Sequence, residues 1–233
     1  AAKQGLTSIE TVFYEIGFDE GDSSNRKLLE AVGQMARRVF CCSPSLFKTL
    51  TDTETPQGIV AAVKHPSVPQ TLPSEHSLYL VVDRVQDPGN LGTMIRTAAA
   101  AQVDGILCLK GTVDPFNPKA LRGTMGAIFR TPIHFYDGPD EVINELQRQD
   151  CQLVAADISG DEFHFDVDYS GPTAIIVGNE GQGITPKLLA AANVKVRIPL
   201  AVGVESLNAA VACGVLLYEA VRFRHSKSRC RQD

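Results

Sequence analysis

The chain has 233 residues, of which 44% are hydrophobic and 21% are charged, and its formal net charge is −5. This composition is typical of a globular protein with a sizeable core, and no apolar run approaches the roughly 18 residues that a membrane span needs. The first residues, Ala1-Ala-Lys-Gln4, lack the apolar stretch of a signal peptide. We therefore expect a cytoplasmic protein with no membrane partner.

Charge and cysteine content narrow the class further. Nucleic-acid binding needs clustered Lys and Arg, because phosphates must be neutralised. One such cluster lies near the C-terminus against the single acid Asp233, and it comprises Arg222, Arg224, Lys227, Arg229 and Arg231. The cluster is either a basic surface or a solvated, disordered end. The six cysteines include no Cys-x-x-Cys pair, so no metal site is expected.

Residues 1–65 alternate short β-branched runs with helical patterns. We predict strands at 11–14, 38–42 and 59–63, and helices at about 24–36 and 44–50. The next segment, 66–76, contains three prolines and no apolar periodicity, which is typical of a linker. The chain is thus predicted to form a small domain over 1–65 and a larger one over 77–233.

The larger domain alternates near-continuous apolar runs with helical patterns. Strands are predicted at 78–83, 106–110, 133–136, 153–158, 174–178 and 194–200. Helices are predicted near 91–102, 118–125, 139–149, 185–192 and 206–223. Such strands are buried on both sides, so the pattern predicts an α/β fold with a mostly parallel sheet covered by helices on both faces.

The first polar segment of interest is Asp87-Pro-Gly-Asn-Leu-Gly-Thr-Met-Ile-Arg96, where a strand gives way to a helix. Ligands of open α/β sheets bind at this carboxyl edge. Asn90 is predicted to cap the helix that begins at Leu91. Arg96 lies less than two turns further along, before a run of small residues that would let another backbone pack closely.

A second segment, Val177-Gly-Asn-Glu-Gly-Gln-Gly183, follows a predicted strand. A dinucleotide site needs Gly-x-Gly-x-x-Gly and an acidic residue about twenty positions later, where this chain has Ile198. A nicotinamide dehydrogenase is therefore disfavoured. Gly178 and Gly181 would instead let bare backbone approach a flat ligand, with Glu180 held beside it.

The third segment is Ile198-Pro-Leu200, followed by a loop and by Ser206-Leu-Asn208 at the start of an alanine-rich helix. Ser206 is a natural N-cap for that helix. Taken in order over about 120 residues, the three segments resemble the motifs of the SpoU/TrmH family of RNA ribose 2′-O-methyltransferases, within the SPOUT superfamily.

Residues 1–65, especially 50–60, resemble the later two-thirds of the ribosomal-protein-like RNA-binding domain that precedes the catalytic domain in many members of that family. The opening strand and helix of that domain have no counterpart here, and Ala1 is not an initiator residue. We expect the natural protein to begin earlier, so that RNA binding by this chain is impaired.

The resemblance implies a C-terminal trefoil knot, S-adenosylmethionine as cofactor and methylation of a ribose 2′-hydroxyl in RNA. Its cofactor positions fall on Gly178, Ile198 and Leu207, with Gly181 and Leu109 as neighbours. Its catalytic positions fall on Arg96, assisted by Asn90, Glu180, Ser206 and Asn208. Arg96 acts either as a base or, as guanidinium chemistry favours, as a stabiliser of negative charge.

Two further expectations concern the partners of the chain. Ribosomal RNA of the large subunit is favoured as substrate because the N-terminal domain is ribosomal-protein-like, and transfer RNA is the alternative. A homodimer is expected because the last helix is apolar over more than one face, and the resemblance adds the first-motif helix as its companion. The competing class is a non-catalytic RNA-binding protein on the same fold.

Overall fold

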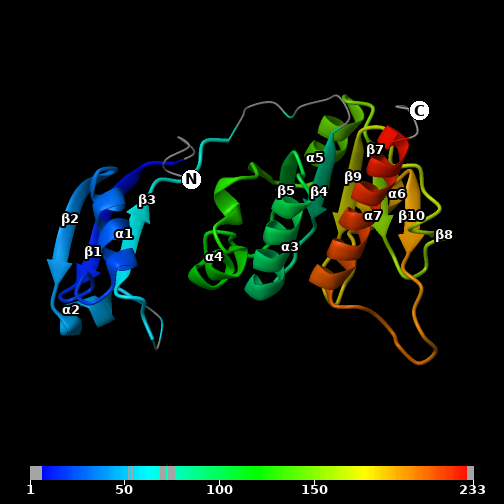
Figure 1. Ribbon diagram of the computed structural model, residues 1–233. Coiled ribbons are helices and arrows are strands. Elements are labelled where there is room, and N and C mark those ends of the chain that lie inside the picture. Colours follow the sequence, from blue (N-terminus) through cyan, green and yellow to red (C-terminus); the bar gives the residue numbers. More distant parts are fainter. Residues whose placement is uncertain (1–6, 52, 54, 69–71, 73–76, 230–233) are drawn as a thin grey trace. The chain divides into compact units, whose positions relative to one another are not determined.

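The computed structural model describes residues 7–51, 53, 55–68, 72 and 77–229, with only the backbone for Ser228 and Arg229. The chain divides into two compact units, residues 1–67 and 68–233 (Figure 1). The division falls within the predicted linker 66–76, most of which lies outside the described residues. Leu72, which is described, is buried and packs in the core of the second unit.

The N-terminal unit is a three-stranded sheet in the order β2-β1-β3 with two helices. Its strands are β1 Ile9–Glu15, β2 Ala36–Cys42 and β3 Ile59–Val63, of which β1 and β2 are parallel and β3 is antiparallel to β1. Its helices are α1 Ser23–Gly33, capped by Asp22, and α2 Pro44–Thr49, capped by Ser43. All five predicted elements are present, although α1 ends earlier than expected.

The C-terminal unit is built on a seven-stranded sheet in the order β6-β5-β4-β9-β7-β10-β8, and every pairing in it is parallel. The strands are β4 Leu78–Val82, β5 Gly105–Leu109, β6 Ile133–Tyr136, β7 Gln152–Ala156, β8 Glu162–Phe163, β9 Thr173–Val177 and β10 Val194–Arg197. The predicted parallel α/β class is confirmed. The two-residue β8 was not predicted, and the trefoil knot stays a prediction of the resemblance.

Helices cover both faces of this sheet (Figure 1). One face carries α3 Pro88–Ala100, α4 Pro118–Thr124, the short 3-10 helix η2 Ala127–Phe129 and α7 Ala209–Arg229, and the other carries α5 Pro139–Gln147 and α6 Pro186–Ala191. The two-residue alternation of β4 divides its side chains between the faces. Leu80 and Val82 pack on the α3 side, whereas Tyr79 and Val81 pack on the α5 side.

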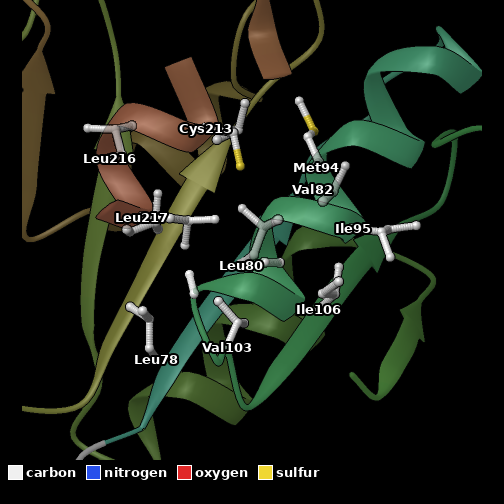
Figure 2. Close-up of a cluster of buried hydrophobic side chains, with 14 of the residues drawn as sticks. Leu78, Leu80, Val82, Met94, Ile95, Val103, Ile106, Cys213, Leu216 and Leu217 are labelled. Atoms are coloured by element: carbon white, nitrogen blue, oxygen red, sulfur yellow. The ribbon is translucent and has the colours of Figure 1, made fainter. Parts of the chain in front are cut away.

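Helices α3 and α7 meet over the middle of the sheet. Figure 2 shows Met94 of α3 and Cys213 and Leu217 of α7 gathered around Leu80 and Val82. Each of these side chains is fully buried, and burial of one large apolar side chain stabilises a fold by about 1.5–3 kcal/mol. The N-terminal ends of both helices are therefore held at fixed places relative to the sheet.

Glycine allows the close packing of α3 against α4. A Cβ added to Gly92 would lie 2.6 Å from the carbonyl oxygen of Ala120 and 2.9 Å from Cα of Gly123. Close backbone contact is therefore made at Gly92, and α7 also packs against the run of small residues after Arg96. In that run, Thr97 faces Gly214 of α7, where an added Cβ would lie at 3.7 Å.

Three side chains of the basic C-terminal cluster have partners among the described residues, and two of the three are in ion pairs. Arg224 donates hydrogen bonds to the carbonyl oxygens of Ser77, Tyr169 and Gly171. Arg222 pairs with Glu219 at 2.6 Å, and Lys227 pairs with Asp168 at 2.9 Å. The segment to Arg229 is helical, so the disordered alternative is wrong for it, and Arg231 lies outside the described residues. No helix among the described residues is long and apolar enough to cross a membrane.

Candidate active site

A cavity of about 580 Å³ lies at the carboxyl edge of the sheet, beyond the ends of β7, β9 and β10. Its wall comes from residues 156–158, the loop 177–184, the loop 198–208 and the start of α7. Seven of the predicted site residues line it: Gly178, Glu180, Gly181, Ile198, Ser206, Leu207 and Asn208. The second and third sequence segments thus meet around one space.

Leu109 does not line this cavity. It is buried at the end of β5 and lines a separate cavity of about 430 Å³ with Lys110 and Tyr136. The reason is the order of the strands, since β4 lies between β5 and β9. The structure therefore places Leu109 apart from the other cofactor positions predicted from the sequence.

The loop 178–183 is closed by hydrogen bonds of its own. The backbone of Asn179 exchanges two hydrogen bonds with that of Gly183, at 3.0 and 2.9 Å. The side-chain oxygen of Asn179 accepts from the amides of Gly181 and Gln182, both at 2.9 Å. Asn179 thus holds the shape of this loop. The side chain of the neighbouring Glu180 takes no part in closing it and contacts residues outside the loop.

The glycines of the loop have different roles. A Cβ on Gly178 would lie 2.4 Å from the backbone of Gly183 and Ile184, so the loop can close only because residue 178 has no side chain. Gly183 has a φ of +68°, which favours glycine. Gly181 has no positive φ, and an added Cβ would meet only the Asn179 side chain at 3.7 Å. Loop closure therefore explains the need for glycine at position 178 but not at position 181, and both residues line the cavity.

The first segment begins its helix earlier than predicted. Helix α3 starts at Pro88, and the side chain of Asp87 caps it by accepting from the amide of Asn90 at 2.8 Å. Asn90 is therefore not the cap. The pair Asp87-Pro88 is itself a strong start signal, because proline suits the first helical position and aspartate suits the cap.

Because Asp87 is the cap, the Asn90 side chain can take part in another contact. Its amide nitrogen donates to Oε1 of Glu180 at 2.9 Å, which joins the first sequence segment to the second. The carboxylate of Glu180 also accepts from the backbone amides of Gln86 at 3.2 Å and Asp87 at 3.3 Å. Gln86 was not found by sequence reasoning, since a backbone donor leaves no signal in residue type.

Helix α7 also starts at a different residue. It begins at Ala209, and the side-chain oxygen of Asn208 accepts from the amides of Ala210 at 2.9 Å and Val211 at 3.2 Å. Asn208 is therefore the cap in place of Ser206, which stays exposed at the cavity wall. The side-chain nitrogen of Asn208 donates to Oδ1 of Asn90 at 2.9 Å, joining the third segment to the first.

Asn208, Asn90 and Glu180 form a relay whose direction is fixed. The oxygen of Asn208 faces the amides of α7, so its nitrogen must face Asn90. The oxygen of Asn90 then accepts, and its nitrogen donates to a carboxylate that can only accept while ionised. Partial burial of Glu180 raises the pKa of its carboxyl, but the hydrogen bonds from Asn90 and from the Gln86 and Asp87 amides outweigh burial and lower the pKa overall. Glu180 is therefore ionised at neutral pH.

Arg96 lies on α3 about 9 Å along the helix axis from Asn90. Its side chain is exposed, and it has no hydrogen bond or ion pair with any residue in the described part of the chain. It does not line the cavity. Its charge is thus not neutralised by those residues, and its predicted catalytic role stays a prediction.

A parallel sheet, a ligand-sized cavity at its carboxyl edge and a fixed amide–carboxylate relay beside that cavity define an α/β ligand-binding domain of the enzyme type. The sequence model of the SpoU rRNA Methylase family matches residues 77–218, and a model described as RNA 2′-O ribose methyltransferase substrate binding matches residues 1–69. The chain belongs to the SpoU rRNA methylase family.

Relatives and solved structures agree with this membership. The chain is 39% identical over 179 residues to the 23S rRNA (guanosine(2553)-2′-O)-methyltransferase RlmP of Bacillus subtilis, which covers 77% of this chain and 71% of the relative. It is 32% identical to the 23S rRNA (uridine(2479)-2′-O)-methyltransferase of Streptomyces viridochromogenes, over 94% of this chain and 77% of that one. The structure of the SpoU methyltransferase AviRb of Streptomyces viridochromogenes in complex with AdoMet superposes with a TM-score of 0.86 at 32% identity, over 97% of this chain and 86% of that chain.

Proposed function

We propose that the protein transfers a methyl group from S-adenosylmethionine to a ribose 2′-hydroxyl of ribosomal RNA. The observation that carries this proposal is the relay of Asn208, Asn90 and Glu180, which joins all three motif segments at one side of the cavity. Family membership and the names of the relatives support the same reaction. Ribosomal RNA is chosen over transfer RNA on those names.

The cavity fits a cofactor of this size. Small-molecule sites have volumes of about 300–1,000 Å³ and are mostly apolar with a few polar groups. Here Val177, Ile198 and Leu207 supply apolar wall, and the 178–183 loop supplies backbone. We assign S-adenosylmethionine to Gly178, Gly181, Ile198 and Leu207, with recognition of the adenine by backbone groups because these side chains form no hydrogen bonds. When bound, it supplies a methyl group activated by a sulfonium.

The polar residues of the site would act on the RNA oxygen. As the 2′-hydroxyl loses its proton to water, negative charge develops on its oxygen, and a preorganised cation stabilises that charge. The oxygen bonds to the methyl carbon as the carbon–sulfur bond breaks, so the products are a neutral 2′-O-methyl ether and S-adenosylhomocysteine. Arg96 is assigned this role rather than that of a base, since guanidinium keeps its proton. Asn90 and Glu180 fix the start of α3, which carries Arg96, while Ser206 and Asn208 are assigned to orient the ribose.

We further propose a homodimer packed through α3 and α7. The outward side of α7 carries Val211 and Tyr218, which are 53% and 50% exposed, and Arg96 is exposed on the adjoining helix. A second copy would cover these apolar side chains. Light scattering should give a mass of twice 25.1 kDa at micromolar concentration, and a stable single-chain mass would contradict the dimer.

The reaction is tested in two steps. Calorimetry measures binding of S-adenosylmethionine, and methyl incorporation into purified ribosomal RNA and transfer RNA measures turnover. Methylated riboses are then mapped as positions that resist alkaline cleavage. A non-catalytic RNA-binding protein would bind RNA without incorporation into either RNA, and incorporation into transfer RNA alone would overturn the choice of substrate.

A further inference from the structure

The turn between β4 and α3 contains a residue in an unusual conformation. Arg84 has a φ of +58°, in the left-handed region that disfavours residues with a Cβ. A non-glycine residue persists there when its surroundings determine its position. The surroundings of Arg84 therefore show what this conformation serves.

Arg84 contacts the 178–183 loop at three places. Its carbonyl oxygen accepts from the side-chain nitrogen of Asn179 at 2.8 Å. Its guanidinium donates to the side-chain oxygen of Gln182 at 2.9 Å and to the carbonyl oxygen of Gly183 at 3.5 Å. One residue thus holds the organising asparagine and the returning end of the loop together.

The guanidinium is itself fixed from the opposite side. Its Nε donates to Oδ1 of Asp83 at 3.0 Å, and Asp83 is fully buried. The other oxygen of Asp83 accepts from the amide and the hydroxyl of Thr185, at 2.5 and 2.7 Å. The Arg84 stem packs against Gly111, where an added Cβ would lie 3.2 Å from its Cγ. Arg84 therefore holds the 178–183 loop itself, and Asp83 holds Thr185, which follows the loop.

Neither Arg84 nor Gln182 lines the 580 Å³ cavity, although Gly181 and Gly183 do. We propose that Arg84 is a positioning residue that holds the 178–183 loop in its cofactor-binding shape from outside the cavity. This inference rests on the assignment of the cofactor to that cavity. The left-handed turn is what directs the guanidinium towards the loop, since the backbone of the same residue must also face Asn179.

The test measures affinity for S-adenosylmethionine by calorimetry well below the melting temperature, where every variant is folded. Arg84→Gly removes the guanidinium at a position where glycine has no strain, and affinity should fall about tenfold. Gln182→Met removes the acceptor without touching Asp83, and affinity should fall about threefold. Arg84→Lys keeps the charge but not the forked geometry, so its affinity should lie between those of the wild type and Arg84→Gly.

Kinetics separate positioning from chemistry. KM for the cofactor should rise in Arg84→Gly and Gln182→Met, while kcat at saturating cofactor stays within about threefold of wild type. The double variant should bind about as weakly as Arg84→Gly alone, because both act through one contact. Arg148→Ala removes an arginine paired with Glu145 on α5 and serves as the control with unchanged affinity.

Wild-type affinity in both Arg84→Gly and Gln182→Met overturns the proposal. A lower melting temperature of Arg84→Gly with unchanged affinity also overturns it, since Arg84 would then only stabilise the fold. Gly181→Val, which alters the cavity wall itself, distinguishes this failure from failure of the site. If Gly181→Val binds the cofactor normally, the cavity assignment is wrong, whatever Arg84 does.

Discussion

Two cavities open at the carboxyl edge of the same sheet, and they differ in what surrounds them. The larger lies beyond β7, β9 and β10 and is bordered by side chains from three distant segments of the chain. The smaller lies beyond β5 and β6 and is formed by two neighbouring loops. Its exposed cation Lys110 is already paired with Asp137 at 3.2 Å. Both cavities thus lie at the edge of the sheet and are large enough for a ligand. Only the larger one is bordered by polar side chains from distant parts of the chain.

The two cavities also differ in how their polar groups are satisfied. Beside the larger one, the relay ends in the ionised Glu180, and the nearby helix α3 carries Arg96 with no partner among the described residues. Beside the smaller one, Glu141 accepts from the amide of Asp137 and Asp114 accepts from that of Phe116. Those carboxylates make local turn contacts. We therefore expect a ligand to bind in the larger cavity.

The largest expected effect is that of Arg96→Ala. Loss of one preorganised charge-stabilising donor lowers a rate by about a hundredfold or more, so methyl transfer should fall at least that far. Cofactor affinity should stay within a few-fold, because Arg96 does not line the cavity. The melting temperature should not change, since the side chain is exposed and unpaired among the described residues. Loss of cofactor binding with an intact fold would contradict the assigned role.

The relay can be broken by a change of charge. Asn90→Asp places a second carboxylate where the amide now donates to Glu180 at 2.9 Å. Two neighbouring carboxylates repel, which raises the pKa of one of them. Methyl transfer at pH 8 should fall more than about tenfold and partly recover at pH 5.5, where a shared proton restores the donor. Asn90→Ala should lose activity without this recovery, and equal pH profiles for the two variants would contradict the relay.

In the wild-type protein, by contrast, the relay should not respond to pH near neutrality. The pKa of its carboxyl is lowered in the folded protein by its hydrogen bonds. Its contribution to stability is therefore complete above its ordinary pKa and is lost only as the pH falls through the lower value in the folded state. Between pH 6 and 8 the wild-type relay should be insensitive to pH, which makes the profile of Asn90→Asp distinctive.

The sequence predicts the strands well because they are continuous apolar runs bounded by polar turns. Helix starts were predicted less well, since Asp87, Asn90, Ser206 and Asn208 can all cap a helix and local chemistry does not rank them. The start of α3 at Pro88 decides that Asn90 reaches Glu180. Which of two neighbouring residues caps a helix therefore depends on contacts with residues that are far away in the sequence.

Strand order was the other feature that the sequence did not give. The family resemblance implied that Leu109 and Gly178 lie near one ligand, and the sequence alone offered no test of this. Only the order β5-β4-β9 shows that they lie in different cavities. The early end of β10 at Arg197 has a local cause, since Pro199 has no amide hydrogen for a further pairing.

Two glycines of the 178–183 loop allow a role in cofactor binding to be separated from a role in loop closure. Gly181→Val adds apolar atoms at the wall of the larger cavity without a backbone conflict, so cofactor affinity should fall about tenfold, or 1.4 kcal/mol, with an unchanged melting temperature. Gly178→Ala would force a Cβ against the backbone of Gly183, so it should lower stability by about 1–3 kcal/mol. Unchanged affinity in Gly181→Val would mean that the loop is only a turn.

The smallest expected effects compare one methylene at each cavity. Ile198→Val removes it from the wall of the larger cavity, where about 0.8 kcal/mol of apolar contact corresponds to a three- to fourfold loss of cofactor affinity. Leu109→Val removes it from the smaller cavity, so it should leave cofactor affinity unchanged and lower only stability, by about 0.5–1.5 kcal/mol. Calorimetry on both variants, with melting curves as the control for stability, checks the difference. A loss of affinity in Leu109→Val equal to that in Ile198→Val would restore Leu109 to the cofactor site, and the distinction between the two cavities would then have to be abandoned.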